Sequence, residues 1–273
     1  MFKWQELTEA LIKLNRGVRP DKLTDNLVVQ LTDDFKNNTG LRVWDKSFIK
    51  NALLNFSYGK CCYCETKLRE ESKYCTVDHY HHKNKYPDEV VAWDNLLPVC
   101  SRCNSKKGTH DTYVMPIIDP TKHDPKQYLF LYNYRYKSRD NDINSIGWAT
   151  IDVLGLNDSQ TMVYPRINIG EAVQTKLADL IDRIHRYSED ESDVRESNKI
   201  ISTITDILKL ALPVKEYSAV TASAILGDVN YIRIKDRMAE LDLWNEELVQ
   251  LEDNLGDVCL LESCFFQTFN KHN

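Results

Sequence analysis

The sequence predicts an α+β fold that is mostly helical, with one small cysteine-rich module between two helical regions. Three observations favour this class. Apolar residues recur at helical spacing near the N-terminus and again after Gly170. Six of the eight cysteines fall between Cys61 and Cys103. Prolines and tyrosines gather in residues 112–144, which favours short strands over long helices there.

The chain divides into four expected parts. They are an N-terminal helical flank at 1–55, the cysteine-rich module at 56–115, a wrapping segment rich in Pro and Tyr at 116–164, and a helical region at 165–273. In the first part we expect helices around Trp4–Leu14 and at Asp45–Asn55. Residues 15–40 between them are expected to be turn-rich, with a short apolar run at Leu27–Leu31.

The second half of the chain is expected to hold short strands and then helices. Strands are predicted within Tyr128–Tyr136. Four helices are predicted after them, at Glu171–Arg186, Val194–Leu212, Ala219–Asp228 and Ile232–Asn254.

Charge is divided unevenly along the chain. The formal charge is −6, which argues against a protein that binds nucleic acid over its whole surface. Residues 165–273 carry 12 Lys and Arg against 20 Asp and Glu, whereas residues 1–164 carry 23 against 21. The acidic helical region therefore suits docking onto another protein. No apolar run is long enough to span a membrane or to serve as a signal peptide, so we expect a cytoplasmic protein.

Four cysteines have the spacing of a structural zinc site. Two C-x-x-C pairs are separated by 35 residues, Cys61 with Cys64 and Cys100 with Cys103. Two such turns can place four thiolates around one Zn²⁺, and four protein ligands close its coordination shell. The alternative is that these cysteines pair in disulfides, which are rare in cytoplasmic proteins. Cys62 could compete as a ligand, and Cys75 is expected to be a small buried residue.

The segment between the pairs predicts a ββα unit. Cys75–Tyr80 alternates as a strand does, Leu96–Val99 can form a second strand, and Ser101 is a suitable N-cap for a short helix. The unit would bring together the side chains of Asp78, His79 and Asn104.

This combination suits phosphodiester hydrolysis. A histidine can take the proton of the attacking water near neutral pH, a role we expect of His79. The oxygen ligands of Asp78 and Asn104 suit Mg²⁺ or Mn²⁺, which would stabilise charge on the phosphate and on the leaving 3′ oxygen.

The whole pattern resembles a known family. Across Cys61–Gly108 the chain reads C-x-x-C, D-H, W-x-N-L, C-x-x-C-N and K-G, which resembles the zinc-knuckle HNH endonucleases of the ββα-metal superfamily. The resemblance implies an HNH module on a structural zinc site, and an endonuclease that cleaves DNA.

The resemblance also assigns roles to residues. It implies that His79 is the general base and that Asp78 and Asn104 hold the catalytic Mg²⁺ or Mn²⁺. Asn95 matches the middle Asn, which braces the loop that positions the base, and Lys107 matches a position that contacts phosphate. His79, Asn95 and Asn104 are thus the expected catalytic residues.

Weaker features suggest a closer relationship. Ile118-Asp119-Pro120, the run Ile151–Asn157 and Arg166 resemble the PtuB-like HNH subunit of Septu-type and retron-associated anti-phage defence systems. That resemblance implies a partner ATPase of the ABC/SMC-like class, with or without a retron reverse transcriptase and its ncDNA complex. The chain departs from the family pattern at His82, where proline is expected.

Other interpretations stay open. Lys83 flanks the site and is expected, with Lys107, to contact nucleic acid, although it could equally be a surface charge. His81 and His82 could contact phosphate or metal or be solvated loop residues. A standalone restriction or homing nuclease, and a zinc-stabilised binding module without catalysis, are the alternative functions.

Overall fold

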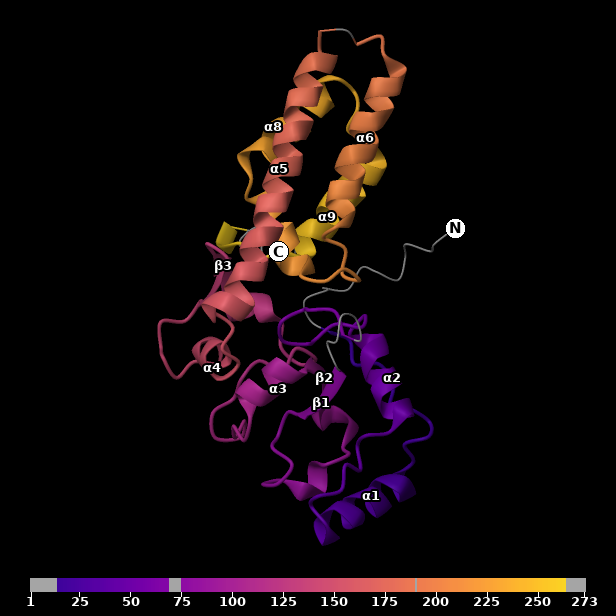
Figure 1. Ribbon diagram of the computed structural model, residues 1–273, viewed down its shortest axis with the longest axis vertical. Helices are drawn as coiled ribbons and strands as arrows, with labels where there is room; N and C mark the ends of the chain where they lie inside the picture. The colour runs from indigo at the N-terminus through magenta and orange to yellow at the C-terminus, as the bar shows by residue number, and fades with distance from the viewer. Residues whose placement is uncertain (1–13, 69–74, 190, 264–273) are drawn as a thin grey trace, which may run out of the picture. The chain divides into compact units, whose positions relative to one another are not determined.

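The computed structural model describes residues 14–68, 75–189 and 191–263 in two compact units (Figure 1). Of the described residues, the cysteine unit holds 14–128 and 137–157, and the helical unit holds 129–136 and 158–263. Helix predominates and the strands are few and short, which confirms the predicted α+β, mostly helical class. In the described part of the chain, no helix is long and apolar enough to cross a membrane.

The cysteine unit begins with two helices. The first, α1, spans Asp25–Asn37, and the second, α2, spans Ser47–Phe56. Helix α2 confirms the helix predicted at Asp45–Asn55, but α1 corrects the turn-rich assignment of residues 15–40. Helix α1 begins where the Thr24 side chain accepts a hydrogen bond from the Leu27 N–H. The apolar residues of α1 pack into the core. The helix predicted around Trp4–Leu14 lies almost wholly outside the described residues.

The ββα unit is present as the spacing predicts. Strand β1, Cys75–His79, pairs antiparallel with β2, Leu96–Cys100, and α3, Ser101–Lys107, follows at once. Helix α3 contacts both strands, and α2 also packs on β2 (Figure 1). The expected cap at Ser101 is wrong, because the Cys100 sulfur accepts the Cys103 N–H at 3.4 Å.

The remaining elements of the cysteine unit are short. They are the 3₁₀ turns η2 at Pro87–Glu89, η3 at Trp93–Asn95 and η4 at Pro125–Gln127, and the helix α4 at Ile146–Val153. The apolar core of this unit joins residues of α1 and α2 to Val77 of β1 and Leu96 of β2. The ββα unit therefore rests on helices that lie outside it in the sequence.

Within its described residues, the helical unit packs five helices around one apolar core. Its elements are β3 Leu129–Tyr132, β4 Arg135–Ser138, the π-turn η5 Ser159–Val163, α5 Tyr164–Tyr187, α6 Val194–Lys209, α7 Ser218–Leu226, α8 Val229–Glu240 and α9 Glu246–Val258. Strands β3 and β4 pair with each other, which confirms short strands within Tyr128–Tyr136. Helix α5 contacts α6, α7 and α8, and Figure 1 shows it running beside α6.

One predicted helix in this unit is two helices. The segment Ile232–Asn254 breaks between α8 and α9, where Asp242 adopts a left-handed φ of 57°. The Asn245 side chain then accepts the Leu248 N–H at 3.1 Å and starts α9. The apolar spacing continued through the break, so periodicity alone did not reveal it.

Candidate active site

Four cysteine sulfurs converge in the cysteine unit. The Sγ atoms of Cys61, Cys64, Cys100 and Cys103 all lie within 4.8 Å of one another, and all four residues are buried. The Cys64 and Cys100 sulfurs are 3.8 Å apart. Thiolates on a tetrahedral Zn²⁺ with bonds of about 2.3 Å lie about 3.8 Å apart, so this cluster fits a structural zinc site.

The cysteine cluster fixes the two ends of the ββα unit. Cys100 ends β2 and caps α3, while Cys103 lies in the first turn of that helix. The turn that carries Cys61 and Cys64 is joined to β2 by a hydrogen bond from the Cys62 N–H to the Pro98 carbonyl (3.0 Å). Cys62 itself is half-buried beside the cluster, and burial raises the pKa of its thiol.

His79 ends β1 in a defined orientation. Its Nε2 lies 2.9 Å from the Val90 carbonyl oxygen, and because a carbonyl only accepts, Nε2 carries the proton. The ring meets the Trp44 ring edge-on at 4.6 Å. This orientation leaves Nδ1 as the proton acceptor. Burial lowers the pKa of His79 to about 3, so the imidazole is neutral at pH 7.

Asp78 points to the opposite face of β1 and is buried. Its Oδ1 accepts from the Lys107 ammonium at 3.0 Å, and its Oδ2 accepts from the Tyr63 hydroxyl at 2.9 Å. Lys107 also donates to the His79 carbonyl at 2.6 Å. Burial raises the pKa of Asp78, and the bonds from Lys107 and Tyr63 oppose that shift.

Lys107 therefore lies in a different place from the one its expected role suggests. Its side chain is 1% exposed and paired with Asp78. In the structure, Lys107 orients Asp78. A contact between Lys107 and phosphate stays a prediction.

Asn95 braces the loop after β1. Its Oδ1 accepts the His81 N–H at 2.6 Å, and its Nδ2 donates to the His81 carbonyl (3.1 Å) and to the Glu89 carbonyl (3.0 Å). Glu89 precedes Val90, the residue that accepts the proton of His79. The buried Asn95 amide thus ties the backbone that follows His79 to the segment that supplies the Val90 carbonyl.

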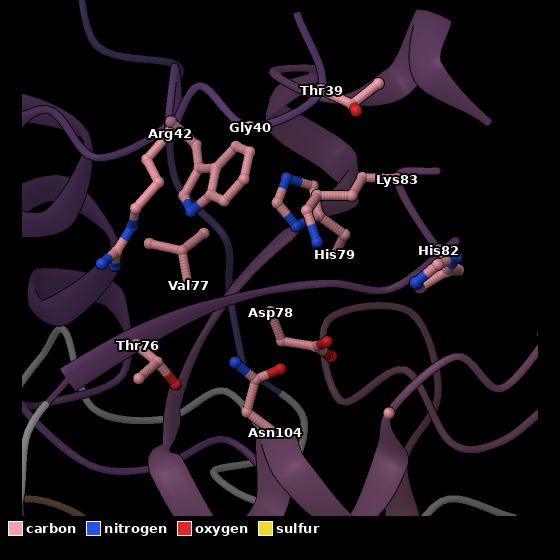
Figure 2. A pocket seen from close by; sticks show the side chains of 12 residues that line it. Thr39, Gly40, Arg42, Thr76, Val77, Asp78, His79, His82, Lys83 and Asn104 are labelled. Atoms are coloured by element: carbon pink, nitrogen blue, oxygen red, sulfur yellow. The ribbon is translucent and has the colours of Figure 1, made fainter. Parts of the chain in front are cut away.

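A cavity of about 360 Å³ collects the remaining candidates. Its described lining residues are Thr39, Gly40, Arg42, Trp44, Thr76, Val77, Asp78, His79, His82, Lys83, Asn104 and Gly108. Figure 2 shows Asp78, His79 and Asn104 close to its centre, with the Asn104 amide rising from α3. Three of the residues predicted from the sequence thus meet in one space.

In Figure 2, His82 lies to one side of this centre, whereas the Lys83 side chain overlaps His79. The Lys83 ammonium is 5.2 Å above the Trp44 ring, and partial burial lowers its pKa. His81, in contrast, is not among the lining residues: its Nδ1 bonds the Thr112 hydroxyl at 2.7 Å, and its ring stacks on Tyr113 at 3.8 Å.

Sequence reasoning missed three neighbours of the site. Tyr63 lies between Cys61 and Cys64 and bonds Asp78. Trp44 packs against His79, and Arg42 lines the cavity, although both precede the ββα unit in the chain. Tyr63 could have been found from the sequence, because it is an aromatic residue inside a C-x-x-C pair. Nothing in the local sequence pattern places Trp44 or Arg42 at the site.

Comparison with known proteins agrees with this geometry. The sequence model of the family "HNH endonuclease" matches residues 61–110, which contain the cysteine cluster and the ββα unit. A Septu protein PtuB from Bacillus thuringiensis is 39% identical over 267 residues, covering 96% of this chain and all of that protein. A second Septu protein PtuB, from Bacillus mycoides strain KBAB4, is 23% identical over 201 residues, or 58% of this chain and 65% of its own. With an HNH endonuclease domain and a full-length match at this identity, the chain belongs to the Septu PtuB family and is an endonuclease.

Proposed function

We propose that this chain hydrolyses DNA phosphodiester bonds with the help of a divalent cation, as the nuclease subunit of an anti-phage Septu complex. The observation that supports this most is the meeting of Asp78, His79 and Asn104 in one cavity. A zinc-stabilised binding module would need the cysteine cluster but not these three side chains together.

His79 is the proposed general base. With its Nε2 proton committed to Val90, Nδ1 can accept the proton of a water that attacks the phosphorus. Trp44 excludes water from one side of the imidazole, and Asn95 holds the loop that supplies the Val90 carbonyl. The 3′ oxygen then leaves the phosphorus as the new P–O bond forms.

Asp78 and Asn104 are the proposed holders of Mg²⁺ or Mn²⁺. Both offer hard oxygen donors to the cavity, and Mg²⁺ in proteins commonly uses few side chains together with water and substrate phosphate. When bound, the cation would offset charge on the phosphate and on the leaving oxygen. Lys107 keeps the Asp78 carboxylate in place beside the cavity.

Substitution of His79 tests the proposal. We expect His79→Ala and His79→Asn to abolish cleavage of plasmid DNA with Mg²⁺ or Mn²⁺ while the zinc content stays that of the parent. His185→Ala, on the exposed face of α5, is the matched control and should cleave as the parent does. The assay is run on the chain alone and on the chain copurified with its ATPase partner. Cleavage at the parent rate by both His79 variants would refute the assignment of the base.

We further propose that residues 165–273 bind the partner, an ABC/SMC-like ATPase, in the cytoplasm. Support comes from the acidity of this segment, 20 Asp and Glu against 12 Lys and Arg. A retron reverse transcriptase with its ncDNA would be a further component. The test is copurification of the full chain with the neighbouring gene's product: lysine substitutions at exposed acidic positions such as Asp206 and Glu247 should weaken it, and unchanged recovery would contradict the proposal.

A further inference from the structure

A turn outside the matched HNH segment forms one wall of the active-site cavity. Thr39, Gly40, Arg42 and Trp44 line the cavity, although residues 39–44 lie between α1 and α2 and precede residue 61 by a whole helix. The nuclease site is therefore larger than its family motif.

This turn is held in place by its own contacts. The Leu41 N–H donates to the Asn38 carbonyl and the Asp45 N–H donates to the Arg42 carbonyl, at 3.0 and 2.9 Å. The next two residues, Val43 and Trp44, are buried in the core of the cysteine unit. The backbone of Arg42 is thus fixed while its side chain stays 65% exposed.

The charges that line the cavity are mostly positive. Among the described lining residues, Arg42 and Lys83 are the basic side chains other than histidine, and Asp78 is the carboxylate. That carboxylate already bonds the buried Lys107. The cavity therefore offers positive charge to an anion at its edges.

Figure 2 shows how the two cations are placed. Arg42 lies on one side of Asp78 and His79, near Thr76, whereas the Lys83 side chain overlaps His79 in this view and its ammonium is 5.2 Å from the centre of the Trp44 ring. Lys83 is thus the cation near the centre that would hold the scissile phosphate, and Arg42 is the cation to one side of it. A nucleic-acid strand carries a phosphate at every nucleotide, so a strand whose scissile phosphate lies at the centre brings a neighbouring phosphate toward Arg42.

We propose that Arg42 binds a backbone phosphate next to the scissile one. The proposal rests on the proposed nuclease function and adds a subsite to it. A guanidinium binds phosphate through two parallel N–H donors, which suits an exposed arginine on a fixed turn. Because phosphate contacts do not read bases, the subsite should raise affinity for any sequence.

In the absence of nucleic acid, Asp45 pairs with Arg42 at this subsite. Its Oδ2 lies 3.2 Å from Arg42 Nη2, and its Oδ1 pairs with Lys50. When Arg42 moves to a phosphate, Asp45 keeps the Lys50 ammonium, so no carboxylate is left unpaired. Exposed ion pairs of this kind are weak, so exchange for a phosphate costs little.

The test compares three substitutions in the full chain carrying His79→Ala, which binds without cutting. Affinity for a fluorescein-labelled DNA duplex is measured by anisotropy between about 50 and 200 mM salt. Arg42→Ala should weaken binding about eightfold at 0.1 M salt and reduce the slope of log K against log salt by about 0.9. Arg19→Ala is the matched control, because Arg19 is also exposed and paired with an aspartate, Asp25, at 2.8 Å, but does not line the cavity.

Asp45→Asn separates a phosphate contact from a structural ion pair. It should tighten binding about two- to fourfold, since it removes the carboxylate that competes for Arg42. If the pair serves only to stabilise the turn, both substitutions would weaken binding together, and the proposal is overturned. It is also overturned if the parent binds DNA and Arg42→Ala behaves like Arg19→Ala. No binding by the parent at any salt concentration, either alone or copurified with its ATPase partner, would refute the nuclease proposal itself, and the subsite with it.

Discussion

The Oδ1 atom of Asn95 accepts a hydrogen bond from the backbone N–H of His81 at 2.6 Å, across the loop that follows β1. The Nδ2 atom of the same amide donates to the Glu89 carbonyl, one residue before Val90. Val90 in turn receives the Nε2 proton of His79. One buried amide therefore fixes both the backbone after His79 and the acceptor that sets its tautomer.

Asn95→Asp should lower kcat by about 10- to 100-fold with little change in KM. The carboxylate keeps the shape of the amide and can still accept from His81, but it faces the Glu89 and His81 carbonyls without protons to donate. Steady-state cleavage rates measure the effect, and zinc content confirms that the module is intact. Asn84→Asp, at an exposed position in the same loop, is the control. Equal rates for the two variants would show that the Asn95 donors are dispensable.

Lys107→Met should destabilise the protein in the absence of added Mg²⁺ or Mn²⁺. Removing one partner of a buried pair leaves an uncompensated charge on Asp78, at a cost of about 3–5 kcal/mol. A divalent cation bound at Asp78 would replace the lost positive charge, so millimolar Mn²⁺ should recover part of the unfolding free energy. Urea unfolding with and without Mn²⁺ measures both effects.

The neighbouring exposed lysine gives the control for this experiment. Lys106→Met changes the same residue type on the same helix without touching Asp78, and should be nearly neutral. A Lys107→Met variant that Mn²⁺ does not stabilise would contradict Asp78 as a ligand of the catalytic cation.

Cys103→Ser should release the zinc and unfold the cysteine unit. Serine does not replace a thiolate on Zn²⁺, and a structural site of this kind contributes folding free energy directly. Cys62→Ser is the matched control: Cys62 adjoins Cys61 but its sulfur is not part of the cluster. Metal analysis and near-UV circular dichroism distinguish the two variants. Loss of zinc from Cys62→Ser with retention in Cys103→Ser would reverse the ligand assignment.

The parts of this site that depend on short sequence motifs could be predicted. The residues that reach the site through tertiary packing could not. C-x-x-C spacing, the alternation around His79 and the turn before Asn104 are short-range signals, so the ββα unit could be derived from about 48 residues. Trp44 reaches His79 from 35 positions upstream through tertiary packing, which no local pattern encodes. The same limit concealed the burial of Lys107: the sequence predicts a contact with phosphate for this residue, but not its pairing with Asp78.

The stability of the protein should depend on pH through His79. Burial lowers the pKa of this imidazole to about 3, whereas in the unfolded chain it is near 6.5. Above pH 6.5 both states are neutral and His79 adds no pH dependence. As the pH falls from 6.5 toward 3, the unfolded state takes up a proton that the folded state does not, so the unfolding free energy falls by up to about 1.4 kcal/mol per pH unit.

Urea unfolding at pH 7.5 and 5.5, without added divalent cation, measures the decline. His79→Asn cannot titrate, so its decline should be smaller than that of the parent by about 1.4 kcal/mol. Equal declines would mean that His79 takes up its proton as readily in the folded protein as in the unfolded chain, and that its ring is more open to water than its contacts with Trp44 and Val90 indicate.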